Sequence, residues 1–223
     1  HDISFQEGDC IIDIGANIGM FSLFAQQQCG QATIYAFEPA PHAFEKLQHN
    51  ARLYCQDATV FNCGIADQNA EALFTYYPHS SVFSSYHPDN HDAQAIKTII
   101  QNTLQQASSI TPEMVEQFSK ELLEERLESQ TIVGQTRTLS SIIDEYRIDS
   151  IDLLKIDAEK SELAILQGVE DSHWAMIKQV VMEVPGRIMG SGIGGQFIEN
   201  IDYDIQTTDP KTVEELGLKK LRL

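Results

Sequence analysis

The sequence predicts an α/β fold built on a doubly wound, Rossmann-like sheet. Three observations predict it: short apolar runs recur along the chain, helical patterns separate them, and the first run ends in a glycine turn. Strands of a parallel sheet are apolar along their whole length because helices cover both faces. Strands that alternate with helices favour right-handed crossovers and therefore a mostly parallel sheet.

The predicted elements follow one another in the order that this fold requires. Helices are expected between the strands, at 19–28, from Pro41 to residue 54, and at 159–169. Proline suits the first turn of a helix, which supports the start at Pro41. Residues 71–78 alternate in polarity and predict an edge strand, and the segments 203–208 and 218–223 could close the sheet as an antiparallel pair. The buried strands are predicted at 10–14, 32–37, 58–65, 150–157 and 177–184.

One segment interrupts the alternation. Residues 88–130 contain two helical patterns, at 92–106 and 112–128, before the next core strand. A helical pair is longer than an ordinary connection, so we expect a lid or a docking element. The length of 223 residues otherwise predicts a single domain over 1–223.

Charge and composition exclude several classes of function. The chain carries 33 acidic and 15 basic residues, a formal net charge of −18, which argues against nucleic-acid binding and against docking on an anionic membrane. No apolar run approaches the roughly 20 residues of a membrane span. The four cysteines lack CxxC spacing, so no zinc site is expected, and reduced cysteines with no signal peptide predict a cytoplasmic protein.

The stretch "CIIDIGANIGM" predicts a cofactor site. Its pattern is G-x-N-x-G after Asp13, and Asn17 stands where dinucleotide-binding turns have the glycine that admits a diphosphate. A carboxylate beside the turn repels phosphate but suits an ammonium or a sulfonium, and S-adenosylmethionine carries both. Glu38 ends the second predicted strand, where an acid accepts hydrogen bonds from ribose hydroxyls.

Three longer segments carry a family resemblance. They are "DIGANIGMFSLF", "YAFEPAPHAFEKLQHN" and "RTLSSIIDEYRIDSIDLLKIDAEKSELAILQGV". Together they resemble the FkbM-type family of class I S-adenosylmethionine-dependent methyltransferases, over residues 10–184. Lys160 and Ser161 stand where Gly-Ala is common in the family. The resemblance implies a seven-stranded sheet whose last strand is antiparallel, and methyl transfer, usually to a hydroxyl oxygen.

The resemblance also implies partners. The helical insertion is similar to that of members embedded in nonribosomal peptide and polyketide synthases. We therefore expect an O-methyltransferase that acts on an intermediate held by an acyl or peptidyl carrier protein through phosphopantetheine, beside neighbouring synthase domains. Two alternatives stay open: a free-standing enzyme for a sugar or small-metabolite hydroxyl, and a non-catalytic scaffold domain that binds S-adenosylmethionine.

The candidate site residues lie at the predicted carboxyl edge of the sheet or near the insertion. Asp157 and Glu183 end core strands, and histidine as a residue type titrates near neutral pH, so Asp157, Glu183 and His87 are the candidates for the acceptor's proton or its orientation. His87 and His91 have the spacing of a metal pair, but Pro88 favours a turn there and no metal is expected. The predicted cofactor-binding residues are Asp13, Gly15, Ala16, Asn17, Gly19, Glu38, Pro39 and Asp157.

Overall fold

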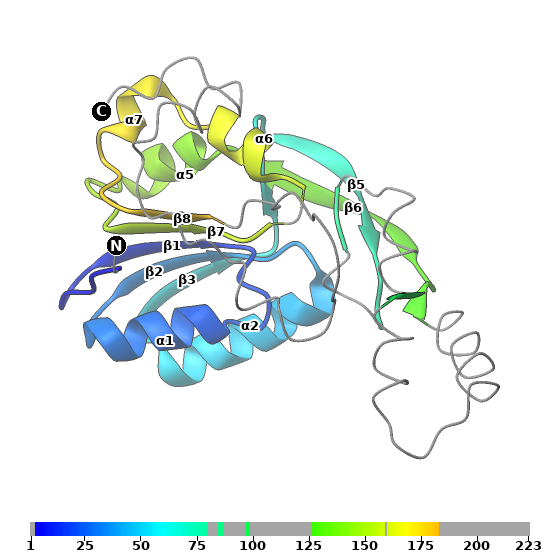
Figure 1. The fold of residues 1–223 in the computed structure, drawn as a ribbon, viewed down its shortest axis with the longest axis horizontal. Helices are drawn as coiled ribbons and strands as arrows, with labels where there is room; N and C mark the ends of the chain where they lie inside the picture. Colours follow the sequence, from blue (N-terminus) through cyan, green and yellow to red (C-terminus); the bar gives the residue numbers. More distant parts are fainter. Residues whose placement is uncertain (1–2, 80–83, 87–96, 99–125, 159, 183–223) are drawn as a thin grey trace. The chain divides into compact units, whose positions relative to one another are not determined.

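The computed structural model describes residues 3–79, 84–86, 97–98, 126–158 and 160–182 (Figure 1). The chain divides into two compact units. The first includes residues up to Ala72 and the segment Val133–Glu183, and the second includes Leu73–Ile132. All the residues of the site described below belong to the first unit.

A parallel five-stranded sheet forms the centre of the first unit, in the order β3-β2-β1-β7-β8. All four residues of β7 are buried, as expected for a strand with helices on both sides. Four of the five predicted core strands are thus confirmed within one or a few residues at their ends. The strands are β1 Cys10–Ile14, β2 Thr33–Phe37, β3 Asp57–Phe61, β7 Leu153–Ile156 and β8 Val180–Met182.

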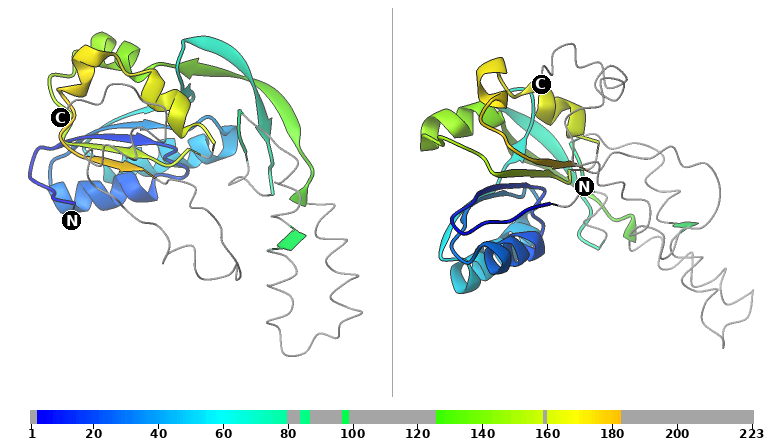
Figure 2. Two further views of the ribbon diagram at one scale, coloured as in Figure 1. Left: turned by 45° about the horizontal axis from the view of Figure 1, so that its top comes forward. Right: turned by 60° about the vertical axis from the view of Figure 1, so that its left-hand side comes forward.

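Helices lie on both faces of this sheet, with α1 and α2 on one face and α5, α6 and α7 on the other (Figures 1 and 2). Neighbouring residues of β1 separate accordingly, because successive side chains of a strand point to opposite faces. Ile11 packs in a core with Leu47 of α2, whereas Ile12 packs in a second core with Ile142 of α5. The bounds are α1 Met20–Cys29, α2 Pro41–Tyr54, α5 Leu139–Tyr146, α6 Glu162–Gln167 and α7 Asp171–Trp174.

A second sheet corrects the predicted arrangement. It has three strands in the order β4-β6-β5, with bounds Gly64–Ile65, Gln130–Arg137 and Ala70–Tyr76. The strand predicted at 58–65 is therefore two strands in different sheets, separated at Asn62 and Cys63. The run at 71–78 is a strand at the edge of this second sheet, so the predicted edge strand is confirmed, although it does not belong to the main sheet. β6 and α5 were not predicted, and β6 begins where the expected insertion ends.

Several predictions lie outside the described residues. They concern the antiparallel pair at 203–208 and 218–223, and most of the helical insertion at 88–130. Of the insertion, residues 97–98 and 126–130 are described, and they belong to the second unit. Before the insertion, Thr75 and Ser85 form a short antiparallel bridge in the same unit. Phe74 packs against Tyr86 there, with ring centroids 4.8 Å apart.

The four cysteines are free thiols. Cys63 is buried and Cys10 is half-buried, as suits a cysteine that packs as a small apolar residue. Burial raises the pKa of Cys10 to about 12 and the pKa of Cys63 to about 11. Among the helices in the described ranges, none has the length and apolar character needed to cross a membrane.

Candidate active site

The connection from β1 to α1 is a tight turn that only particular residues can form. Gly15, Asn17 and Gly19 have positive φ angles of 72°, 51° and 88°. A Cβ on Gly15 would lie 1.9 Å from the carbonyl oxygen of Asp157, so the ends of β1 and β7 approach too closely for any side chain. The amide of Asp157 also donates to the Ile14 carbonyl at 3.0 Å. Glycine at position 15 is therefore required by both conformation and space.

Three consecutive amides of this turn already have acceptors within the protein. The N–H groups of Gly15 and Ala16 both donate to the Phe37 carbonyl at 3.0 Å. The N–H of Asn17 donates to Oε2 of Glu38 at 2.8 Å. Phosphate-binding turns instead keep their amides free to point at the ligand. This turn therefore offers acceptors and negative charge where a diphosphate would need donors.

Glu38 follows β2 directly and links the turn to α2. Its Oε1 accepts a hydrogen bond at 2.8 Å from the amide of Ala40, the residue that precedes α2. The residue is only 8% exposed. Burial raises the pKa of Glu38, although the two amide donors and the nearby Lys155 ammonium act in the opposite direction. Two further lone pairs of the carboxylate remain for a ligand, since each oxygen can accept two hydrogen bonds.

Asn62 is a site residue that the sequence analysis missed. Its amide nitrogen donates to the backbone carbonyls of Glu38 at 2.9 Å and Pro39 at 3.2 Å. It thus fixes the loop that carries Glu38. An asparagine directly after an apolar strand was the available signal, but the prediction of one long strand over 58–65 concealed it.

A buried charge cluster lies behind the turn. Asp13 is fully buried, and its register partner on the neighbouring strand is Lys155. The Lys155 ammonium lies 3.1 Å from Oδ1 of Asp13 and 3.1 Å from Oδ2 of Asp157. It also donates to the Gly15 carbonyl at 3.0 Å, while the Ser22 hydroxyl donates to Oδ2 of Asp13 at 2.7 Å. Lys155 therefore neutralises these acids and does not point to the opposite face of the sheet.

The charge state of the cluster follows from its geometry. Burial acts to lower the pKa of Lys155, but the carboxylates of Asp13 and Asp157 outweigh it and raise that pKa above its ordinary value. Lys155 is thus an ammonium at neutral pH and not a general base. With Glu38, three carboxyl groups surround one cation, so the edge of the sheet favours a positively charged ligand.

The remaining predicted site residues divide into two groups. Ala16 is buried in the turn and Pro39 is half-buried beside Glu38, so both lie with the other cofactor candidates. His87 and Glu183 lie outside the described residues. In the part of the chain that is described, no three histidine, cysteine, aspartate or glutamate side chains are grouped so that they could hold a metal ion.

Comparison with known proteins decides the family. The family described as "Methyltransferase FkbM domain" matches residues 13–199, which is most of the chain. This chain belongs to the FkbM family of methyltransferases. The resemblance in the three segments of the sequence is confirmed, and family membership makes the chain an S-adenosylmethionine-dependent methyltransferase of the FkbM type.

Relatives of this FkbM-family chain include free-standing and embedded proteins. It is 40% identical over 184 residues to "31-O-demethyl-FK506 methyltransferase FkbM" of Streptomyces tacrolimicus, covering 82% of this chain and 68% of the relative. It is 33% identical to "AMB antimetabolite synthetase AmbE" of Pseudomonas aeruginosa, covering 82% of this chain but 9% of that protein. "Methyltransferase sdnD" of Sordaria araneosa is 32% identical, with 78% of this chain and 65% of the relative covered.

The site fits the cofactor that the FkbM family implies. S-adenosylmethionine has a sulfonium, an ammonium and a ribose but no phosphate. The turn has its amides occupied, a carboxylate with acceptor capacity in Glu38, and an excess of negative charge. The occupied amides and the negative charge match that molecule better than a dinucleotide, whereas an acid that accepts from ribose hydroxyls suits both.

Proposed function

We propose that this domain binds S-adenosylmethionine at the β1–α1 turn and methylates a hydroxyl of an intermediate tethered to a carrier protein. The observation that supports the cofactor site is the occupied set of turn amides together with the surplus of carboxylates. The similarity to a segment of a large synthetase supports the tethered acceptor. A cytoplasmic location is part of the same proposal.

In this proposal the cofactor residues act in two ways. The turn residues Gly15 to Gly19, with Glu38, Pro39 and Asp157, would contact the cofactor. Asp13 is fully buried, so it would act through its charge and through Lys155. When bound, S-adenosylmethionine supplies a methyl group on a positively charged sulfur.

The acceptor needs a base and an aligned position. A hydroxyl is a weak nucleophile until its proton leaves, and a positioned base contributes about 10²–10⁴-fold. Asp157 directly follows β7 with 49% of its side chain exposed, so we assign it the acceptor's proton. His87 and Glu183 remain candidates for the same step or for orienting the acceptor.

Binding measurements test the cofactor site. Wild-type protein is expected to bind S-adenosylmethionine and not NAD in isothermal titration calorimetry. Glu38→Gln should weaken S-adenosylmethionine binding about tenfold, equivalent to about 1.4 kcal/mol, because the amide loses acceptor capacity and charge. Glu45→Gln on the exposed surface of α2 is the control and should bind as wild type. NAD binding in place of S-adenosylmethionine would refute the site.

A panel of acceptors tests the substrate class. The same hydroxyacyl groups are offered on phosphopantetheine carrier protein, as small thioesters and as free acids, with radiolabelled methyl donor. We expect the carrier-bound form to be methylated fastest. Preference for an untethered hydroxyl would favour the second candidate, a free-standing small-molecule enzyme, which the likeness to the FK506 methyltransferase supports. Donor binding without any transfer would indicate the scaffold role.

A further inference from the structure

We propose that Lys155 is a positioning residue, which holds the carboxylate of Asp157 in a fixed orientation against the β1–α1 turn. The inference rests on the proposed function, because it concerns how one of the proposed site residues is oriented. Lys155 would act through Asp157 and would not touch the cofactor or the acceptor.

The first argument is the number of acceptors around the ammonium. The ammonium donates a hydrogen bond to the carbonyl of Gly15 at 3.0 Å and forms ion pairs with Asp13 and Asp157, each at 3.1 Å. Phe21 of α1 lies on a further side, with its ring centroid 5.6 Å from the ammonium. The ammonium is thus fixed from several directions and has a defined position from which to hold Asp157.

The second argument is the difference between the two carboxylates. Asp13 has a second partner in Ser22 and is fully buried, so it stays anchored without the lysine. Asp157 is half-exposed, and in the described part of the chain the side chain that binds its carboxylate is Lys155. Removing the ammonium would therefore release Asp157 far more than Asp13.

The third argument is that the cluster joins two segments distant in the sequence. Asp13 and Gly15 belong to β1 and its turn, whereas Lys155 and Asp157 belong to β7 and the residue after it. Because Asp157 also approaches Gly15 through its backbone, the lysine fixes the side chain of a residue whose main chain is already placed. Lys155 therefore fixes the orientation of the Asp157 side chain, and an active site needs its reacting groups aligned in this way.

The test uses a change that keeps the local net charge. Lys155→Met alone leaves Asp13 as an unpaired buried charge and is expected to destabilise the fold strongly. The pair Asp13→Asn and Lys155→Met removes one charge of each sign, so the attraction for a cationic ligand is preserved. Asp157→Asn is then introduced into both the wild-type and this double background, and the dissociation constant of S-adenosylmethionine is measured for all four proteins by calorimetry.

We expect strong coupling between the sites. Asp157→Asn should weaken binding about tenfold in the wild-type background but less than about threefold in the double background, where Asp157 is no longer oriented. Lys178→Met is the matched control, since Lys178 also pairs with an aspartate, Asp152, but on the exposed surface at the other end of β7. It should bind as wild type.

The outcomes separate the two proposals. Failure of wild-type protein to bind S-adenosylmethionine overturns the proposed function and this inference with it. Binding with an equal effect of Asp157→Asn in both backgrounds, or with no effect in the wild type, overturns only the inference. If the double variant does not fold, the pair Asp13→Asn and Lys155→Gln, which also removes one charge of each sign, replaces it as the background. An unchanged effect of Asp157→Asn there also refutes positioning by Lys155.

Discussion

Gly15 and Gly30 both have a positive φ angle but different surroundings. Their φ angles are 72° and 71°. A Cβ at position 15 would lie within the carbonyl group of Asp157, whereas a Cβ at position 30 would meet nothing within 4 Å. The pair therefore separates the cost of a positive φ from the cost of a steric clash.

We predict that Gly15→Ala destabilises the protein much more than Gly30→Ala. The alanine at position 30 should cost about 1–2 kcal/mol for its positive φ. At position 15 the backbone of β7 must also move, which adds about 1–3 kcal/mol. Urea unfolding followed by circular dichroism measures both. Equal losses of unfolding free energy would mean that the close approach of the two strand ends is not a constraint.

Single residues also show what could be predicted about the site. Asn17 and Glu38 were both assigned to the cofactor from the motif, and a hydrogen bond of 2.8 Å joins them. From the sequence alone, Lys155 could face either layer of helices, as any buried strand residue can. Its register opposite Asp13 resolves the choice.

At the scale of elements, strands and helices with a strong hydrophobic pattern were predicted correctly, and those with a weak pattern were not. β1, β2, β7 and β8 are short apolar runs, and helices α1, α2 and α6 follow as expected. The residues of β6 have no strong apolar face, and they come directly after the helical pattern at 112–128. No strand was therefore expected there. The helix α5 is short, and its start is marked by the N-cap Thr138, whose side chain accepts a hydrogen bond from the Ser141 amide. This signal is recognised only once the helix is known.

The break between β3 and β4 is determined by tertiary contacts. Residues 58–65 look like one apolar run, but Asn62 turns to hold the loop after β2. Gly64 and Ile65 then pair with Thr136 and Arg137 of β6. Partners far along the chain determine both events, and no local pattern encodes them.

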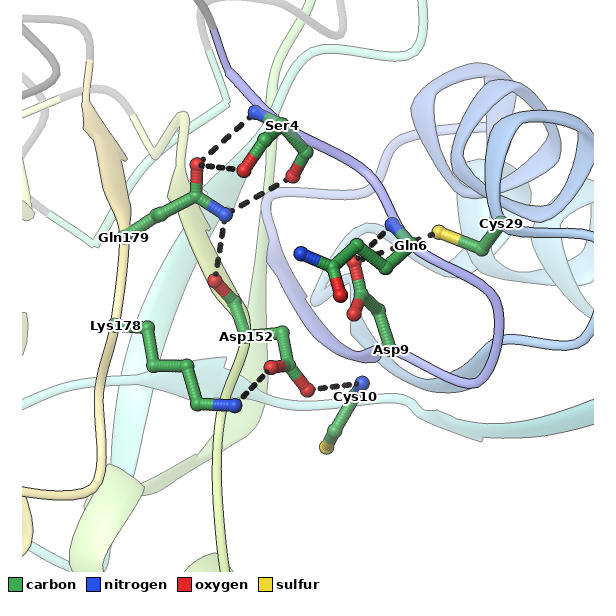
Figure 3. A network of polar contacts seen from close by, with 8 residues as sticks. All are labelled: Ser4, Gln6, Asp9, Cys10, Cys29, Asp152, Lys178 and Gln179. Carbon is green, nitrogen blue, oxygen red and sulfur yellow. Dashed lines mark hydrogen bonds and ion pairs between the residues drawn. The ribbon is translucent and has the colours of Figure 1, made fainter.

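At the scale of the whole molecule, a polar network ties distant segments of the first unit together (Figure 3). Asp152, just before β7, accepts hydrogen bonds from the Cys10 amide at 2.9 Å and from the Lys178 ammonium at 2.6 Å. Gln179 bonds to both the amide and the carbonyl of Ser4, at 3.1 and 3.0 Å. The start of β1, the start of β7 and the approach to β8 are thereby held at one end of the sheet.

We predict a pH-dependent effect of Asp152→Asn. Burial acts to raise the pKa of Asp152, but Lys178 and the Cys10 amide outweigh it and lower that pKa below its ordinary value of 3.8. A carboxyl with a lowered pKa stabilises the fold above its unfolded pKa, and this contribution is lost as the pH falls through the folded pKa. At pH 6 the variant should lose about 1–2 kcal/mol of unfolding free energy.

Urea unfolding of the wild type and of Asp152→Asn between pH 6 and pH 3 checks the predicted pH dependence. The difference in unfolding free energy between wild type and variant should stay constant down to about pH 4 and narrow below it. A difference that does not change with pH would show that the charge of Asp152 has no part in the network. Ser141→Ala, which removes a hydroxyl contact near α5 and no charge, serves as the pH-independent control.

The sequence by itself determined the strand–turn–helix unit, the strand-end acid at Glu38 and the family, because each depends on residues close together in the chain. Only the tertiary structure decided that the turn amides are occupied, that Lys155 bridges Asp13 and Asp157, and that Asn62 secures the Glu38 loop. These contacts arise from the parallel register of β1 with β2 and β7, and that register is established when the whole sheet assembles. Local patterns specify the elements, whereas the chemistry of the site depends on which strand ends meet.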